Sequence, residues 1–384
     1  VPLTPMQASL RVVLSVGESS GDYLAAHLAR TLKKQHPNIE LAGLAGPLMV
    51  AEGVEPWFEL DSLNVMGLQE VVRHLPRLIR LRREFRQKIM AWQPDVFIGV
   101  DAPDFNLGLA KQLKKVGLST MHYVSPSVWA WRSHRIKNLS NSVNALMTLF
   151  PFEPALYQPY GLQTTCVGHP LADDITKTLA SLDRAHNPLS DAPSIALLPG
   201  SRQAEIDRHT DLLMHTARAI RAHRPEAHFI MPLVRAEHAT SVHARCPELV
   251  TELGVEVIVN ATRQALGRAD VAINASGTVT LETFLMACPQ VVFYRLAPMT
   301  HWLAKSLRLV QTEHVSLPNI LTQQALVPEF IQNEASPEAL SQAALAWLDD
   351  VGRADDYKQT ASEWQARLTA DGRAAQQVLE FVSR

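Results

Sequence analysis

Four short segments carry side chains suited to binding a ligand at the end of a β-strand. They are residues 17–22 (GESSGD), 100–106 (VDAPDFN), 197–202 (LLPGSR) and 274–282 (NASGTVTLE), and an apolar run that predicts a buried strand leads into each. In a parallel sheet, the first amides of the next helix and the positive end of its dipole attract anions. The segments at residues 17–22, 197–202 and 274–282 therefore indicate anion binding, and no GxGxxG dinucleotide fingerprint is among them.

Two carboxylates follow the apolar run at residues 96–100, and they are candidates for acid–base chemistry. A carboxylate that is partly desolvated at a strand end has the properties of a general base. Asp101 is nearer the strand end, whereas Asp104 follows Pro103 in a pattern typical of a helix cap. Helix capping explains the presence of these two carboxylates equally well, without any role in catalysis.

The second half of the chain offers groups for a nucleotide. Arg202 has a planar guanidinium that suits a diphosphate, and Glu282 has a carboxylate that suits ribose hydroxyls. A surface turn with a solvated arginine would also explain the segment around Arg202. An ordinary capped helix would also explain the segment that contains Glu282. The residues assigned to the sugar nucleotide are Gly200, Ser201, Arg202, Ser276, Gly277, Thr278 and Glu282.

Residues 65–92 form a basic amphipathic stretch in a chain that is slightly acidic overall, with a formal net charge of -2. Such a stretch binds an anionic lipid surface, although a solvated helix packed on its own domain gives the same pattern. The aromatic segment at residues 123–132 suits a sugar or an acyl surface. The residues assigned to the acceptor and membrane side are Arg73, Arg77, Leu78, Ile79, Arg80, Trp129 and Trp131.

Short apolar runs alternate with helical patterns along the 384 residues, which predicts an α/β fold with two Rossmann-like, doubly wound domains. We place one domain at residues 1–186, which carries the basic stretch, a nucleotide-binding domain at 187–356, and a helical tail at 357–384 that returns to the first domain. The three cysteines have no paired spacing, and no histidine cluster has metal-ligand spacing.

The composition bounds the partners and the compartment. Near-neutral net charge gives no reason to expect nucleic acid as a partner. The first residues lack a signal-peptide pattern and no run of 18 apolar residues occurs, so we expect a cytoplasmic protein without metal or cofactor. The sequence leaves the oligomeric state open.

Five segments taken together resemble the lipid-A-disaccharide synthase family, and the resemblance covers nearly the whole chain. They are residues 17–22, 100–106, 123–132 (YVSPSVWAWR), 197–202 and 316–319 (SLPN). The resemblance implies the GT-B architecture, in which two Rossmann-like domains face a cleft. It implies an inverting, metal-independent transfer that joins UDP-2,3-diacylglucosamine to 2,3-diacylglucosamine 1-phosphate. The products are UDP and the β-1,6-linked lipid A disaccharide 1-phosphate.

The resemblance also implies roles for individual residues. Asp101 is the expected general base, Glu18 is its rival, and Asn319 is a further active-site residue. The expected location is the cytoplasmic side of the inner membrane of a Gram-negative cell, with the protein peripherally bound to the inner leaflet.

Three other interpretations share some of these motifs. A UDP-N-acetylglucosamine 2-epimerase would need the same nucleotide turns, but it needs no lipid surface. A transferase with a polyprenyl-linked acceptor would need both the nucleotide turns and a lipid surface. The third is a non-catalytic scaffold that binds lipid or nucleotide. For such a protein, a change of Asp101 would alter neither activity nor ligand affinity.

Overall fold

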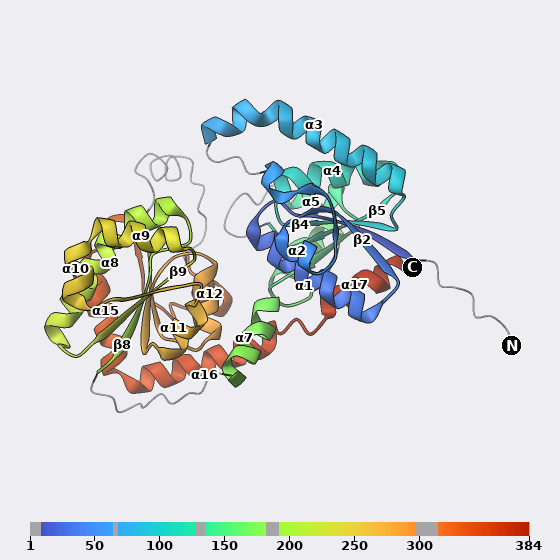
Figure 1. Cartoon of the computed structure of the whole chain (residues 1–384). Helices are drawn as coiled ribbons and strands as arrows, with labels where there is room; N and C mark the ends of the chain where they lie inside the picture. The colour runs from blue at the N-terminus through green and yellow to red at the C-terminus, as the bar shows by residue number, and fades with distance from the viewer. Residues whose placement is uncertain (1–8, 64–67, 127–134, 182–191, 296–313, 384) are drawn as a thin grey trace. The chain divides into compact units, whose positions relative to one another are not determined.

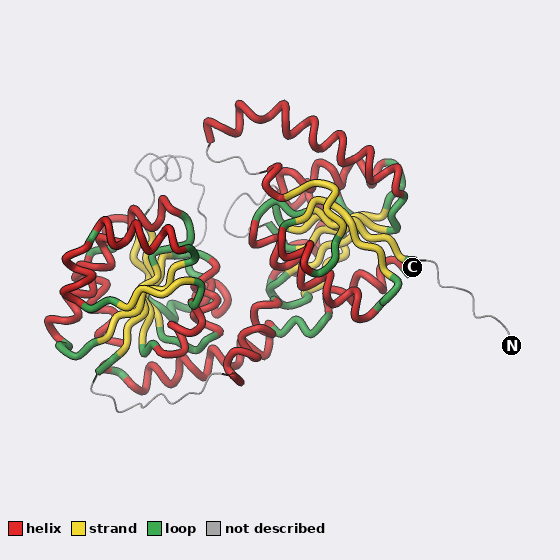
Figure 2. The backbone as a smooth tube through the Cα atoms, in the orientation of Figure 1, coloured by secondary structure: helices red, strands yellow, loops and turns green. Residues whose placement is uncertain are grey.

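The computed structural model describes residues 9–63, 68–126, 135–181, 192–295 and 314–383. These residues form two α/β units, and the strands of each unit form a parallel sheet. Unit 1 comprises residues 1–170 and 368–384, and unit 2 comprises residues 171–367. Figure 2 shows that each unit has its own sheet with helices packed around it. Two parallel sheets with flanking helices confirm the predicted α/β fold class.

Within the described residues, unit 1 has a seven-stranded sheet in the order β3-β2-β1-β4-β5-β6-β7 (Figure 1). Its strands are β1 (Leu10–Ser15), β2 (Ile39–Ala45), β3 (Glu55–Glu59), β4 (Val96–Val100), β5 (Ser119–Tyr123), β6 (Ala145–Thr148) and β7 (Gln163–Cys166). Its helices are α1 (Ser19–Gln35), α2 (Pro47–Ala51), α3 (Leu68–Trp92), α4 (Pro103–Lys115), α5 (Arg135–Ser142), α6 (Glu153–Tyr157) and α17 (Arg373–Val382). The strand order reverses between β1 and β4, which is where doubly wound sheets bind ligands.

Unit 2 has a six-stranded sheet among its described residues, in the order β10-β9-β8-β11-β12-β13. Its strands are β8 (Ser194–Leu198), β9 (His228–Leu233), β10 (Glu256–Val259), β11 (Val271–Ala275), β12 (Gln290–Tyr294) and β13 (Glu329–Ile331). Its helices are α7 (Pro170–Ser181), α8 (Gln203–His223), α9 (Ala236–Arg245), α10 (Pro247–Leu253), α11 (Thr262–Arg268), α12 (Thr278–Leu285), α14 (Leu317–Thr322), α15 (Pro337–Asp349) and α16 (Val351–Leu368). Here the order reverses between β8 and β11.

The contacts divide the chain after Pro170 and after Arg367, whereas the sequence analysis placed the boundaries after residues 186 and 356. The difference at the tail has a clear cause. Tyr357 of α16 is 1% exposed, and its ring packs edge-on against Phe284 and Trp347, so this helix belongs to the core of unit 2. The final helix, α17, packs on α1 within unit 1.

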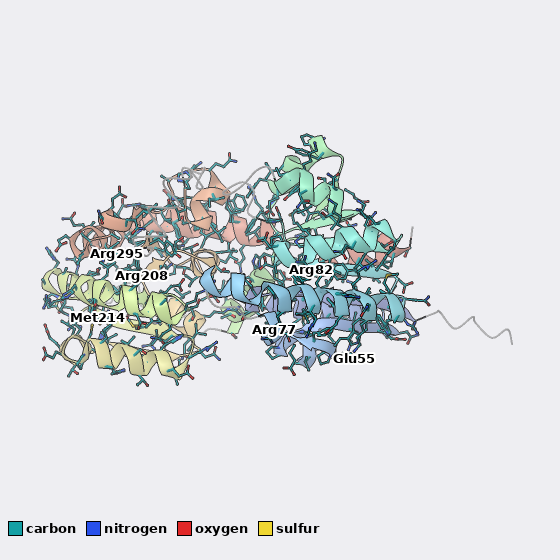
Figure 3. All side chains as sticks on the ribbon, turned by 90° about the horizontal axis from the view of Figure 1, so that it is seen from above. Glu55, Arg77, Arg82, Arg208, Met214 and Arg295 are labelled. Atoms are coloured by element: carbon teal, nitrogen blue, oxygen red, sulfur yellow. The ribbon has the colours of Figure 1, made fainter. Side chains whose placement is uncertain are left out.

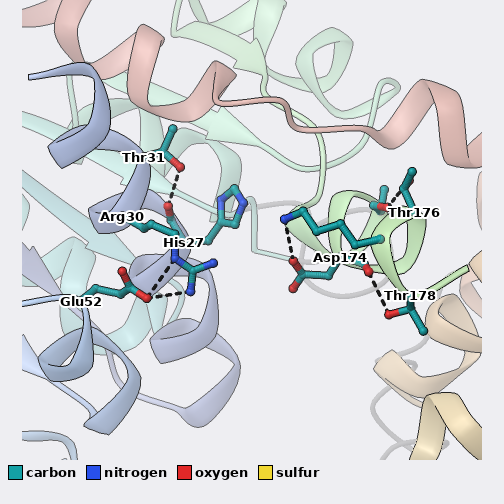
Figure 4. A network of polar contacts seen from close by, with 9 residues as sticks. His27, Arg30, Thr31, Glu52, Asp174, Thr176 and Thr178 are labelled. Carbon is teal, nitrogen blue, oxygen red and sulfur yellow. Dashed lines mark hydrogen bonds and ion pairs between the residues drawn. The ribbon is translucent and has the colours of Figure 1, made fainter. Parts of the chain in front are cut away.

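Short polar contacts fix the helices to their neighbours. Arg30 of α1 donates from Nε and Nη2 to Glu52 at the end of α2, at 2.9 and 2.7 Å (Figure 4). The hydrogen bond from Arg30 lowers the pKa of Glu52, which keeps this carboxylate ionised. The pair therefore joins α1 to the end of α2.

One buried side chain, Asn106 of α4, ties together the ends of β1 and β4. Its Oδ1 accepts from Ser15 Oγ at 2.7 Å. Its Nδ2 group donates to the carbonyl oxygens of Ser15, Val100 and Asp101 at 3.1, 3.3 and 2.9 Å. Asn106 is 0% exposed, so no bulk water replaces these contacts. The side chain thus sets the relative position of two strand ends at which ligand-binding residues were predicted.

We predict that Asn106→Ala lowers the free energy of unfolding of unit 1 by about 3 kcal/mol, because one hydroxyl and three carbonyl groups lose a buried partner. Hydrogen exchange of the β1 and β4 amides measures this value. Asn141→Ala, at an exposed position of α5, is the matched control. A loss below about 1 kcal/mol would contradict the role given to Asn106.

Candidate functional site

In unit 1, the turns after β1 and β4 meet at the point where the strand order reverses. Ser20 Oγ in the first turn of α1 donates to Asp101 Oδ2 at 3.1 Å. A Cβ atom on Gly21 would lie 3.3 Å from the carbonyl oxygen of Val100, so the glycine allows α1 to approach β4 closely. Glu18 is the exposed residue that precedes α1. The structure therefore brings the turn that carries Glu18 to the half-exposed Asp101.

The backbone around Asp101 is strained. Asp101, Ala102 and Val124 have φ angles of 54°, 42° and 83°, in the left-handed region that L residues avoid and that a β-branched valine disfavours most. Each such residue costs on the order of 1–3 kcal/mol, and such strain concentrates at functional sites. Hydrogen bonds hold it in place: Asp101 N donates to the carbonyl oxygen of Tyr123, and Val124 N donates to that of Met147, both at 2.9 Å.

The start of the aromatic segment is anchored in unit 1. Ser125 and Tyr157 share a 2.6 Å hydrogen bond between their hydroxyls. Burial raises the pKa of Tyr157 to about 12, so its hydroxyl stays protonated at neutral pH. Trp129 and Trp131, which we assigned to the acceptor side, lie outside the described residues.

In unit 2, a cavity of about 430 Å³ opens at the carboxyl ends of β8 and β11. Its volume is in the range of small-molecule sites. All the residues that the sequence analysis assigned to the sugar nucleotide line it, together with others that include Glu205 and Tyr294. Burial raises the pKa of Tyr294, so its hydroxyl is a proton donor at neutral pH.

One side of this cavity differs from the sequence-based expectation. We expected the amides after Gly200 to be available to a diphosphate, but Ser201 N and Arg202 N donate to Glu205 Oε2 at 2.9 and 3.2 Å. Gly200 has a φ angle of 120°, and a Cβ atom there would lie 2.5 Å from that same oxygen. The glycine therefore makes room for a carboxylate of the protein itself.

The other side of the cavity is the start of α12. The residue that precedes this helix, Gly277, has no side chain to accept from the first amides. Glu282, one turn further along, accepts from Arg263 Nε at 2.9 Å. Sequence reasoning missed Arg263, because the partner of a carboxylate 19 residues away depends on how α11 and α12 pack.

Asn319 lies beside this helix start but is 1% exposed. Its Nδ2 donates to the carbonyl oxygen of Val327 and to Glu329 Oε1, both at 2.9 Å, and its Oδ1 accepts from Val327 N at 2.9 Å. The same Glu329 carboxylate accepts from the backbone amides of Val315 and Ser316. The amide of Asn319 thus holds a loop, and Ser276 Oγ donates to Val315 O in that loop at 3.4 Å.

Residues 68–92 of the basic stretch form α3, which lies against α4 (Figure 1). Leu81, Phe85 and Ile89 are buried, whereas Arg77, Ile79 and Arg80 are exposed, and Leu78 is half-buried. The side chain of Arg73 lies outside the described residues.

One arginine of α3 is turned inward. Arg82 donates from Nη2 to the carbonyl oxygen of Asp104 at 3.1 Å and lies over the ring of Phe105 (Figure 3). Burial lowers its pKa. This contact ties the basic helix to the helix that follows Asp101.

The described residues also bear on metal binding and on membrane spanning. Among them, no three His, Cys, Asp or Glu side chains are grouped so that they could hold a metal ion. None of the described helices has the length and the apolar character needed to cross a membrane.

Comparison with known proteins identifies relatives over nearly the full length. A family model described as lipid-A-disaccharide synthetase matches residues 12–380. Proteins named lipid-A-disaccharide synthase are similar: that of Chromohalobacter salexigens is 44% identical, covering 89% of this chain and 88% of its own, and that of Pseudomonas fluorescens is 42% identical, covering 98% and 99%.

Solved structures resemble the fold at low sequence identity. A UDP-GlcNAc 2-epimerase from Neisseria meningitidis bound to UDP-GlcNAc has a TM-score of 0.66 at 10% identity, covering 97% of this chain and 99% of its own. The calicheamicin glycosyltransferase CalG4 has a TM-score of 0.63 at 14% identity, covering 98% and 99%. At such identities the likeness shows the fold alone.

Proposed function

The chain belongs to the lipid-A-disaccharide synthetase family and is a glycosyltransferase of lipid A disaccharide synthesis, and within that activity we propose that unit 2 holds the UDP-sugar and Asp101 of unit 1 activates the acceptor. The donor is UDP-2,3-diacylglucosamine and the acceptor is 2,3-diacylglucosamine 1-phosphate. The family match over residues 12–380 favours this reaction over the epimerase and polyprenyl-acceptor alternatives, which share only the nucleotide-binding part of the argument. A scaffold without turnover does not fit a family of enzymes.

The observation that carries the donor assignment is the cavity in unit 2, which all the predicted nucleotide residues line. The amides of Gly277 and Thr278, at the start of α12, suit the diphosphate because the helix dipole is positive there and Gly277 leaves room for close approach. The amide of Ser276, which the sequence also assigned to the diphosphate, donates instead to the carbonyl oxygen of Phe293 at 2.8 Å. Arg202, whose side chain is 74% exposed, supplies a mobile positive charge for the departing UDP. Glu282, oriented by Arg263, suits the ribose hydroxyls.

The base assignment follows from how rigidly Asp101 is held. Inversion at the anomeric carbon needs one in-line attack by the acceptor 6-hydroxyl, and hence one base that removes its proton. Asp101 is fixed by Ser20 through its carboxylate and by Asn106 through its carbonyl group. Glu18, exposed on the neighbouring turn, remains the rival base. Because Asn319 uses its amide to hold the loop beside α12, we assign it a positioning role in the active site.

The exposed arginines of α3 support a peripheral contact with the inner leaflet of the cytoplasmic membrane. Both substrates carry acyl chains and sit in that surface, so an enzyme bound to it meets them at high local concentration. Arg77 and Arg80 are exposed next to Ile79, which is 59% exposed, while the buried stripe of the same helix packs on unit 1. Such a basic face with apolar tips suits anionic lipid.

Asp101→Asn should lower turnover about 100-fold or more and leave UDP affinity unchanged, because the variant removes only the proton acceptor. Disaccharide formation from the two purified substrates in detergent with EDTA measures turnover, and calorimetry measures UDP binding. Asp104→Asn, three residues further on, is the matched control and should keep its activity. Full activity of Asp101→Asn together with an inactive Glu18→Gln would transfer the role to Glu18.

Glu282→Ala should abolish the preference of the protein for UDP over 2′-deoxy-UDP. A hydrogen bond from a ribose hydroxyl to a carboxylate is worth about tenfold in affinity, and only the wild type makes it. Titration calorimetry with both nucleotides gives the ratio, and Glu252→Ala, exposed on α10, is the control. An equal preference in wild type and variant would remove Glu282 from the ribose.

Arg77→Glu with Arg80→Glu should weaken binding to vesicles of phosphatidylcholine and phosphatidylglycerol about tenfold or more, because each reversal removes one favourable charge and adds a repulsive one. Vesicle flotation measures the bound fraction. Lys111→Glu with Lys115→Glu makes the same charge change on the exposed side of α4 and should bind normally. Equal losses in the two double variants would mean that net charge, not the face of α3, governs binding.

A further inference from the structure

The cavity of unit 2 contains a carboxylate that the donor assignment does not use. Glu205, in the first turn of α8, lines the cavity and its side chain is 16% exposed. Its Oε2 accepts from the amides of Ser201 and Arg202, and its Oε1 lies 3.7 Å from Arg202 Nη1. A negative group of the protein therefore occupies the turn where a phosphate oxygen would otherwise bind.

The two helix starts that border the cavity are thus electrostatically different. At α8, the amides and the positive end of the dipole are already matched by Glu205. At α12, the preceding residue is Gly277, which has no side chain that could do the same. An incoming diphosphate is attracted to α12 and repelled by the carboxylate on α8.

We propose that Glu205 is a specificity-determining residue of the donor cavity: it takes the place of a phosphate oxygen on the α8 turn, directs the diphosphate to α12 and weakens the binding of UDP. The inference rests on the proposed binding of the UDP-sugar in this cavity. Its consequence is kinetic, because a product that carries the full charge of the diphosphate leaves more readily when a fixed negative charge faces it.

The test compares ligands with and without the diphosphate. Glu205→Gln keeps the size of the side chain, and its amide oxygen can still accept from Ser201 N, so the turn is retained while the charge is removed. We expect UDP to bind more tightly to this variant, by about tenfold or more, because the effect of removing one charge a few ångströms away lies between its small value in bulk water and its larger value at the effective dielectric of a protein surface. Uridine, which has no phosphate, should bind as it does to the wild type.

Calorimetry with UDP and uridine gives both affinities, and inhibition of disaccharide formation by UDP gives an independent value that should change by the same factor. Glu237→Gln removes one exposed carboxylate from the first turn of α9 and is the matched control. Glu205→Ala, which removes both the charge and the cap, should still bind UDP more tightly relative to uridine.

Unchanged or weaker UDP binding by Glu205→Gln, with uridine binding intact, would overturn the proposal and leave Glu205 as a helix cap only. Equal loss of UDP and uridine binding in both Glu205 variants would overturn it as well, because the residue would then support the turn. If Arg202→Ala and Glu282→Ala also leave UDP affinity unchanged, the donor assignment itself fails, and this outcome is distinct from the other two.

Discussion

The arrangement of unit 1 depends on the hydrogen bonds of one amide, that of Asn106. A parallel sheet presents its strand ends at one edge, but nothing in the sheet itself fixes the turns that follow. Asn106 does so from α4, since its two N–H groups are shared among the carbonyl oxygens of Ser15, Val100 and Asp101. The left-handed backbone at Asp101 and Ala102 follows directly, and the buried contacts of Asn106 offset its strain.

Unit 2 uses a comparable polar network below its cavity. Asn274 of β11 donates to Thr283 Oγ1 and Gln290 Oε1, and Gln290 in turn donates to Tyr357 Oη. The hydroxyl of Tyr357 is fully buried, and burial raises its pKa well above the ordinary value. The network joins β11, α12, β12 and α16, so the start of α12 is held at the cavity by residues far away in the sequence.

Features of the fold that depend on local pattern could be predicted from the sequence, and features that depend on packing could not. Apolar runs identified most of the central strands but not β6 and β7, which have only four residues each. β3, at the sheet edge with two glutamates in five residues, and β13, with only three residues, also carry too weak a pattern. Glycine and hydroxyl residues after strands located the cavity of unit 2. The pairing of Arg263 with Glu282 needs the three-dimensional fold. Glu205 had a local signal, because a glutamate three residues after the N-cap residue, here Arg202, is typical of the carboxylate that accepts from the N-cap amide in a capping box.

Carboxylates that accept from two consecutive backbone amides recur in this protein, and their positions explain why the cavity is asymmetric. Asp22 accepts from Leu48 N and Met49 N, and Glu153 accepts from Leu149 N and Phe150 N. Asp22 and Glu153 are each 2% exposed, so neither carboxylate faces a ligand in solution. Glu205 makes the same contact at the wall of a cavity, where its charge also acts on whatever enters. A carboxylate that holds a turn thus also affects ligand binding at Glu205, where a charged ligand is expected. Because Glu205 occupies the start of α8, the start of α12 is the more favourable place for an anion.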